Sequence, residues 1–385
     1  MIHDSIRRKL ILIASAIAAF CCVFDAQRLV WVLSTPFQYE KDFTQFYLLG
    51  AAFRTGKYIY TPLQELTPIF HLGYFFETPS PYPPVVALVG MPFSYLPYYW
   101  AVLIWEFLEF TWLALSIALI IKHFGGRRAP TAVIFAALLF ICWRPVYVDI
   151  YLGQMMGLIT FLLTLAWLNL EARREVIGGL LLGLVITLKM YAWPIFIFLL
   201  LRKRFKAVGT AAALLITINI AMAFLFGPQI LLDQVRVSRA LATHYSPIPY
   251  NFSLWAVGLR TLGNHVAIAY CAIVLIGALV LAYRSEFTEG FMIMIVVSTL
   301  LQPMAWTPGL VTLLPAVCVA VLKVRDRRSL IFAGVLLFLA MWRGLGQAEY
   351  NLPHLWSSWT PIAFVLGLLL LLGLNQTSEK VRSPA

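Results

Sequence analysis

The sequence has 385 residues, of which 61% are hydrophobic and only 12% are charged, and its mean hydropathy is +0.84. Soluble globular domains carry about 25% charged residues, so this composition excludes a soluble protein, and the net charge of +12 does not indicate nucleic-acid binding. It is typical of an all-α polytopic membrane protein. We expect about 11–13 transmembrane helices in a single integral-membrane domain over residues 1–385. The five cysteines lie in apolar runs without metal-ligand spacing, so we interpret them as packing residues and expect no metal site.

Clusters of basic residues predict how the chain is oriented in the membrane. One cluster precedes the first apolar run at 10–33, and others lie at 122–128, 171–175, 202–206 and 323–328. By the positive-inside rule these segments are cytoplasmic. Residues 85–97 are apolar but too short to span at about 1.5 Å per residue. Without that run we expect about twelve crossings, with both termini in the cytoplasm.

Two extracytoplasmic loops are predicted, at 34–84 and 227–265. In the first, apolar residues recur at helical spacing over 43–56, which predicts an amphipathic helix lying flat at the membrane surface. The dense aromatic residues of this loop suit either sugar stacking or an interfacial aromatic belt. The remaining crossings are predicted at 98–121, 131–143, a run ending at Leu170, 207–226, 266–283, 291–301, a run ending at Leu322, 329–342 and 360–374, with two short pieces at 176–188 and 192–201 hinged at Leu188–Tyr191.

On this topology, several ionisable side chains fall on the outer side of the membrane, away from the basic clusters. They are Asp42, Arg144, Asp149, Lys189, Arg236, Arg239, His244 and Arg343. Ionisable groups at membrane depth are costly and usually mark a pathway or a site. An acid with several cations suits a lipid-phosphate donor, because the cations hold the phosphate and the carboxylate takes the proton of an attacking hydroxyl. The sequence has no nucleotide-binding motif, as expected if an activated sugar arrives on a lipid.

Six segments occur in an order that carries a family resemblance. They are DFTQFYLLGAAFRTGKYIY, SPYPPVVALVGMPFSYLP, LGQMMGLITFLLTLAW, GGLLLGLVITLKMYAWPIFIFLLLRKRFKA, NFSLWAVGLRTLG and LLQPMAWTPGLVTLLP. The chain resembles, over about residues 35–325, the polyprenyl-phosphate-mannose-dependent α-mannosyltransferases of the GT-C superfamily, glycosyltransferase family 87. The resemblance implies a GT-C-type fold and sugar transfer, with mannose as the favoured sugar, from a polyprenyl-phosphate donor to a glycolipid or glycan acceptor.

The resemblance also implies roles for single residues. Asp42 stands at the position of the family's catalytic acid and is expected to be the general base. The expected substrate-binding residues are Lys189, Gln154, Arg144, Arg236, Arg239, His244, Tyr82, Tyr191 and Asn251. No cofactor or nucleic acid is expected, and membrane lipids surround the protein. The expected location is the bacterial inner (plasma) membrane, as a multi-pass protein whose active site faces the extracytoplasmic side.

Other interpretations remain open at this point. Lys189 could snorkel from a short helix end, Gln154 could tie helices together, and Asn251 could cap the following helix. The roles of Arg236, Arg239 and His244 rest on charge and location alone. Where the family pattern continues into Asp and a His pair, this chain reads Trp306, Thr307, Pro308, Gly309, which leaves the sugar or the acceptor open; His244 or His354 could substitute. The rival classes are a transferase for another lipid-linked sugar, a lipid transporter and a non-catalytic GT-C scaffold.

Overall fold

The structure is a computed structural model that describes residues 41–70, 72, 78–124, 143–248, 251–323, 365–370 and 372. Every regular element within these residues is a helix, which confirms the all-α fold class. The crossings expected at 10–33, 131–143, 329–342 and 360–374, together with Arg343 and His354, lie wholly or largely outside the described residues.

Three described helices are long and apolar enough to cross a membrane: α5 (Tyr98–His123), α11 (Phe205–Phe226) and α14 (Asn264–Arg284). A fourth candidate is the pair α7 (Arg144–Leu152) and α8 (Met156–Glu171), which bends by 119° between its two halves. The other crossings expected within the described residues fall on shorter apolar helices. These are α9 (Glu175–Leu188), α10 (Trp193–Leu201), α15 (Phe287–Leu301) and α16 (Leu314–Leu322). The expected total of crossings therefore stays a prediction.

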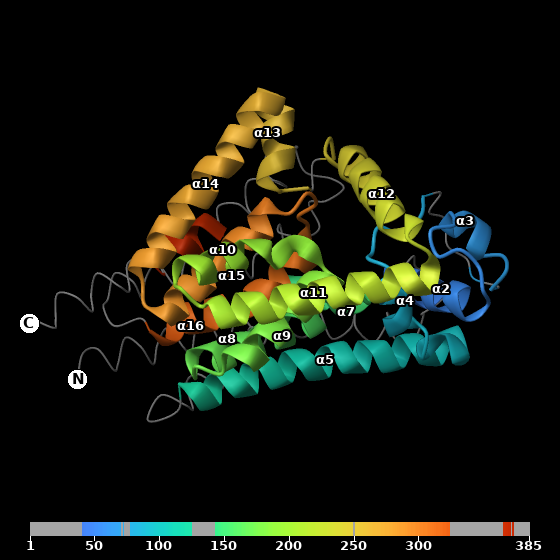
Figure 1. Ribbon diagram of the computed structural model, residues 1–385, viewed down its shortest axis with the longest axis horizontal. Helices are drawn as coiled ribbons and strands as arrows, with labels where there is room; N and C mark the ends of the chain where they lie inside the picture. The colour runs from blue at the N-terminus through green and yellow to red at the C-terminus, as the bar shows by residue number, and fades with distance from the viewer. Residues whose placement is uncertain are drawn as a thin grey trace, which may run out of the picture.

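The described parts of the segments expected to be cytoplasmic meet at one end of the helix bundle (Figure 1). His123 at the end of α5 lies 3.0 Å from Glu171 at the end of α8. Arg204, just before α11, pairs with Glu175 at the start of α9 over 2.9 Å, and Lys323 after α16 pairs with the Glu289 carboxylate of α15. Together with the hydrogen bond from Thr288 to Glu171, these contacts bring the described parts of four turns together, at 122–124, 171–175, 202–206 and 323.

Two helix breaks lie in the interior. The chain leaves α9 at Lys189, whose backbone is extended (φ −154°), and re-enters a helix through η2 (Met190–Ala192) before α10. This confirms the hinge predicted at Leu188–Tyr191. The second break follows α7, where Gly153 has the left-handed φ of +64° that ends the helix. The run at 85–97 forms only α4 (Val85–Gly90) and η1 (Phe93–Tyr95), which confirms that it does not span.

The first loop forms α2 (Phe43–Arg54) and the short α3 (Leu63–Leu66). The helix α2 was predicted. The prediction that one side of it faces water is wrong, because every residue from Phe43 to Ala52 is buried. The reason is a close crossing with α4. A Cβ added to Gly90 would lie 1.8 Å from the carbonyl oxygen of Phe46, so only glycine lets the two helices approach this closely.

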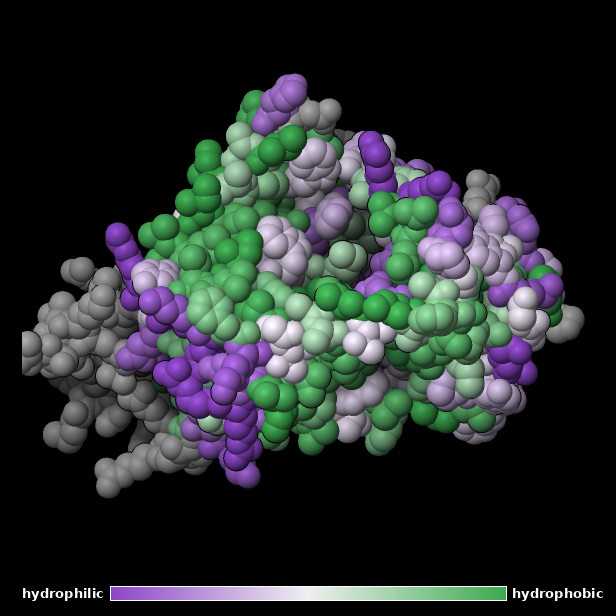
Figure 2. All heavy atoms as spheres, viewed as in Figure 1, coloured by the Kyte–Doolittle hydropathy of each residue, from purple (hydrophilic) through white to green (hydrophobic). Residues whose placement is uncertain are grey.

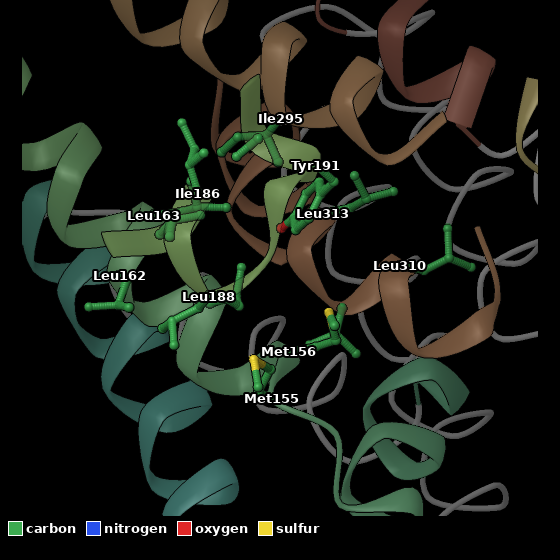
Figure 3. Packing of buried hydrophobic residues seen from close by; sticks show 14 of the residues in the cluster. Met155, Met156, Leu162, Leu163, Ile186, Leu188, Tyr191, Ile295, Leu310 and Leu313 are labelled. Carbon is green, nitrogen blue, oxygen red and sulfur yellow. The ribbon is translucent and has the colours of Figure 1, made fainter. Parts of the chain in front are cut away.

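The second loop forms α12 (Gln229–Tyr245) and α13 (Leu254–Leu262), and it is here that an amphipathic surface helix lies. On α12, Ile230 and Leu241 are buried, whereas Arg236 and Arg239 are exposed. The turn predicted at 302–309 leads into η3 (Thr307–Leu313), which packs against α7 and α8. Figure 3 shows the apolar core at this junction, where side chains of α8, η2 and η3 meet.

Candidate active site

Asp42 lies where the N-terminus of α2 meets the break between α7 and α8. Its side chain is 6% exposed. One carboxylate oxygen accepts a hydrogen bond from the Gln45 amide over 3.0 Å, and the other accepts one from the Gln154 amide over 2.6 Å. Gln45 in turn accepts a hydrogen bond from the Ser80 hydroxyl over 3.1 Å. The carboxylate is therefore held in a fixed orientation, at a helix N-terminus where the backbone dipole favours negative charge.

Gln154 connects this acid to a cation. Its side-chain oxygen accepts from the Lys189 ammonium over 3.4 Å, while its amide nitrogen donates to Asp42. Gly153 places it there, because a Cβ on Gly153 would lie 2.7 Å from the Cβ of Phe43 and push the break away from α2. The backbone carbonyl of Gln154 also accepts from the Trp105 indole over 3.1 Å. The acid, the amide and the cation thus form one line, in which Asp42 and Gln154 are buried and Lys189 is partly buried.

Lys189 is held at the helix break between α9 and η2. Its ammonium lies 5.9 Å from the ring centroid of Tyr82 and interacts electrostatically with Asp149, Asp42 and Glu109. The ring of Tyr82 also packs edge-on against Phe46 at 4.7 Å. Lys189 is partly buried, and its charge faces the three buried acids of the site. The structure therefore brings together four of the predicted site residues: Asp42, Tyr82, Gln154 and Lys189.

Two further acids join the site that the motifs did not assign. Glu109 of α5 accepts a hydrogen bond from the backbone amide of Gly157 over 2.6 Å, and it interacts with Asp149 of α7. Neither oxygen of Asp149 has a hydrogen bond of ordinary geometry among the described residues, and Lys189 is its main opposite charge. The signal for Glu109 was its place inside an apolar helix, where ionisable side chains are rare and usually functional.

A buried ion pair lies on the other side of Asp42. The Lys41 ammonium bonds the Glu106 carboxylate and also donates to the backbone carbonyl of Tyr151 over 2.9 Å. Lys41 is 1% exposed, so its position differs from that of an ordinary loop lysine. The motifs did not assign this pair either, although Glu106 stands one helical turn before Glu109 in the same apolar run. The pair fixes the residue next to Asp42 against α5 and the end of α7.

The predicted cations of α12 do not reach Asp42. Arg236 pairs with Asp233 over 3.0 Å and its side chain is 70% exposed; Arg239 and His244 are also exposed. The helix nevertheless lies beside the site. The Gln234 amide is 4.0 Å from the sulfur of Met190, which follows Lys189, and Ser238 donates to the carbonyl of Pro81 over 3.5 Å.

One contact ties α12 to the first loop. The Tyr58 hydroxyl donates to the Asp233 carboxylate. Partial burial, and then this hydrogen bond, raise the pKa of Tyr58 to about 12. The same hydrogen bond is the largest cause that lowers the pKa of Asp233. Both groups therefore keep the protonation states that this bond needs throughout the neutral range.

Asn251 and Tyr191 make contacts that hold the fold together, and their predicted substrate-binding roles stay predictions. Asn251 donates to the carbonyl of Pro303 over 3.2 Å and accepts from the amide of Ala305 over 3.0 Å, so it fastens the loop before α13 to the turn before η3. The helix cap is Ser253 instead, which accepts from the amide of Ala256. Tyr191 is buried, with its ring packed beside Leu313 (Figure 3).

The structure does not place the remaining predicted positions in the site. Arg144 begins α7, but its side chain lies outside what the structure describes. At the departure from the family pattern, Thr307, Pro308 and Gly309 are buried in η3, and no histidine of the described chain lies in that segment. His244, which could have substituted, packs edge-on against Tyr245 on the exposed side of α12.

A buried carboxylate and a partly buried ammonium set among apolar helices define a membrane protein with a polar intramembrane site. A family model described as glycosyltransferase family 87 matches residues 81–342, which is more than half of the chain. The chain therefore belongs to glycosyltransferase family 87 and is a membrane glycosyltransferase. No curated protein and no solved structure matches it. The family match includes Tyr82, Gln154 and Lys189 but begins after α2, so the role of Asp42 depends on its geometry.

Proposed function

We propose that the protein transfers a sugar, with mannose as the first candidate, from a polyprenyl-phosphate donor to a hydroxyl of a glycolipid or glycan acceptor. The observation that carries this proposal is the hydrogen-bonded line from Asp42 through Gln154 to Lys189. It supplies a proton acceptor and a phosphate-binding cation side by side. Family membership supports the transfer of a sugar, and the donor, the acceptor and the mechanism are our inference.

The reaction is a single displacement. Asp42 accepts the proton of the acceptor hydroxyl as its oxygen forms a bond to the anomeric carbon. The bond from that carbon to the donor phosphate breaks on the opposite face, so the configuration inverts and polyprenyl phosphate leaves with the bonding electrons. Phosphate leaves without protonation, so one carboxylate suffices and a second, acidic one is not required.

Lys189 stabilises the leaving phosphate. An ammonium beside the departing oxygen is worth most in a site that excludes water, because the charge that develops there is poorly solvated otherwise. Arg236 and Arg239 on the exposed side of α12 receive the donor headgroup at the membrane surface before it enters. The proposed reaction needs no cofactor, and we place the site on the extracytoplasmic face of the bacterial inner membrane because the basic clusters gather at the other end of the bundle.

Asp42→Asn tests the proposal directly. The amide keeps the size of the side chain and can still accept a hydrogen bond, but it cannot take the hydroxyl proton. We expect transfer of radiolabelled mannose from polyprenyl-phosphate mannose, in membranes containing the protein and their native acceptors, to fall by about 10²–10⁴-fold. Glu65→Gln is the matched control, since Glu65 is an exposed acid of the same loop. Full turnover by Asp42→Asn would remove Asp42 as the base.

The donor sugar and the acceptor are tested separately. Mass spectrometry of envelope glycolipids from cells with and without the gene should show one glycolipid or glycan that lacks a single hexose. A difference of a pentose would replace mannose by another lipid-linked sugar. Identical glycolipids, with radiolabelled lipid moving across the membrane only when the protein is present, would favour a lipid transporter, which the two broken helices also suit.

A further inference from the structure

The opposite end of the bundle carries a hollow that sugar transfer does not use. It has a volume of about 770 Å³ and is lined by residues of the turns before α9 and α11 and by the first residues of these helices: Arg173, Arg174, Glu175, Val176, Ile177, Lys203, Phe205 and Lys206. Within the described chain none of the four cations has an acidic partner. The one acid, Glu175, is paired with Arg204 over 2.9 Å, so the hollow is strongly positive.

The two turns that form the hollow have the same construction. Arg173 and Lys203 adopt left-handed φ values of 61° and 57°, where glycine is the usual residue. In each turn the next amide reaches back to a helix carbonyl, from Arg174 to Asn169 over 2.8 Å and from Arg204 to Leu199 over 2.9 Å. Each turn thus presents a cation at the start of the following helix.

Close packing of α9 against α11 sets the two turns side by side. A Cβ on Gly179 would lie 2.4 Å from the carbonyl oxygen of Ala207, and one on Gly183 would lie 2.8 Å from that of Ala211. Small residues at this spacing let the two helix axes approach closely. The cations of both turns are therefore held around one space and do not spread over the surface.

Apolar side chains continue from the hollow along both helices. Val176 of α9 is 54% exposed, and Phe205 of α11 is 63% exposed. Farther along α11, Ile216 and Phe224 are exposed too. Figure 2 shows hydrophilic residues gathered at this end of the molecule and largely hydrophobic surface along α11. A positive hollow that opens onto a membrane-facing apolar surface matches a ligand with an anionic head and hydrocarbon chains.

We propose that this hollow binds the headgroup of an anionic phospholipid of the leaflet at the basic end of the bundle, with its acyl chains lying along α9 and α11. Basic pockets between membrane helices on the cytoplasmic side suit phospholipid headgroups of this kind. The positive-inside rule alone accounts for the presence of the cations, but it requires neither a shared hollow nor the adjoining apolar side chains. The proposal does not depend on the sugar-transfer reaction.

The test is binding of phosphatidylglycerol to the purified protein, measured by native mass spectrometry and by the shift in melting temperature. Phosphatidylcholine with the same acyl chains and inorganic phosphate are the comparison ligands. The double variant Arg173→Gln and Lys203→Gln should weaken phosphatidylglycerol binding by about 25-fold, or about fivefold for each charge removed. The double variant Lys57→Gln and Arg284→Gln removes two exposed charges elsewhere and should bind like the wild type.

A second variant separates binding from folding. Arg173→Gly with Lys203→Gly removes the same charges while placing the residue best suited to the left-handed turns, so its melting temperature in phosphatidylcholine should equal or exceed that of the wild type. Its affinity for phosphatidylglycerol should still fall. Unchanged affinity in either double variant would overturn the proposal. So would equal binding of phosphatidylcholine, or a stabilisation by inorganic phosphate that equals that by phosphatidylglycerol.

Discussion

Gln154 is the residue on which the proposed site depends most directly, so its removal is the sharpest test of the geometry. Gln154→Ala takes away the amide that donates to Asp42 over 2.6 Å and the oxygen that accepts from Lys189 over 3.4 Å. The backbone bond from the Trp105 indole to residue 154 is retained, so the helix break itself should persist. The variant therefore loosens the acid and the cation without deleting either.

The expected loss follows from the kind of bond that is broken. A hydrogen bond to an ionised group contributes about 1.5–3 kcal/mol. If that orientation is needed in the transition state, kcat falls by about 10- to 150-fold, since about 1.4 kcal/mol corresponds to a factor of ten. The donor KM should change less, because Lys189 remains. Initial rates of mannose transfer over a range of polyprenyl-phosphate mannose concentrations measure both constants.

Gln64→Ala is the control, since Gln64 is an exposed amide on α3 in the same loop. It should retain wild-type kcat. A Gln154→Ala enzyme with normal kcat would refute the view that Gln154 orients Asp42. A uniform loss of folded protein, seen as a collapsed size-exclusion profile, would instead assign Gln154 the role of tying helices together and would equally refute it as a positioning residue.

Two further predictions test other parts of the structure. Lys189→Ala should raise the donor KM by about 10- to 100-fold, with a smaller effect on the KM for the acceptor, because a charge-assisted phosphate contact is lost. The control is Lys57→Ala, since Lys57 is an exposed cation of the first loop. An unchanged donor KM in Lys189→Ala would refute the assignment of Lys189 to the phosphate. Gly90→Ala should destabilise the protein by about 1–3 kcal/mol or more in thermal unfolding, because the new methyl group overlaps the Phe46 carbonyl. The control is Gly209→Ala on α11, whose new methyl group meets no atom within 4 Å and should leave the stability unchanged or raise it.

The sequence predicted the part of the site that depends on local pattern. Lys189 interrupts an otherwise apolar run, so the helix break at Leu188–Tyr191 was predicted from composition. The break at Gly153 was not predicted, although Gly153 and Gln154 interrupt another apolar run. Positions of this kind are informative because a polar residue or a glycine inside a membrane helix needs a structural reason. Lys189 and Gln154 meet in space, where the ammonium donates to the amide oxygen over 3.4 Å, and the side of the membrane on which they lie stays a prediction.

The burial of α2 could not be predicted from the same pattern. Its sequence mixes apolar residues with Thr44 and Gln45, which reads as an amphipathic surface helix. The close crossing of α2 and α4 at Gly50 and Gly90 decides the position of α2. A hydropathy pattern does not reveal a contact between two glycines. The partners of Lys41 were hidden for a similar reason, since Glu106 lies 65 residues away and nothing local connects them.

The direction of the α12 cations could not be predicted, because charge and location say nothing about where a side chain points. Arg236 and Arg239 lie on the same loop as predicted, but the helix turns its apolar stripe, with Ile230 and Leu241, toward the core. On a helix of 3.6 residues per turn, the cations are then carried to the outer side. Their exposure fits reception of a headgroup at the surface better than contact with the reacting atoms.

The buried acids explain why the site needs the whole bundle. Each charge taken from water costs several kcal/mol unless it is paired and hydrogen-bonded. Lys41 balances Glu106, and Lys189 faces Asp42, Asp149 and Glu109 together, so the inner cluster has more acids than cations. A second positive charge would bring the cluster closer to charge balance. The donor does not supply one, since its phosphate is negative. The cluster therefore favours proton uptake by Asp149 or Glu109 when the donor binds, since Asp42 must stay ionised to act as the base. Calorimetry of donor binding in buffers of different ionisation enthalpy should reveal about one proton taken up per donor. Binding without proton uptake would mean that the acids and Lys189 are already balanced, and that Lys189 has no charge to spare for the phosphate.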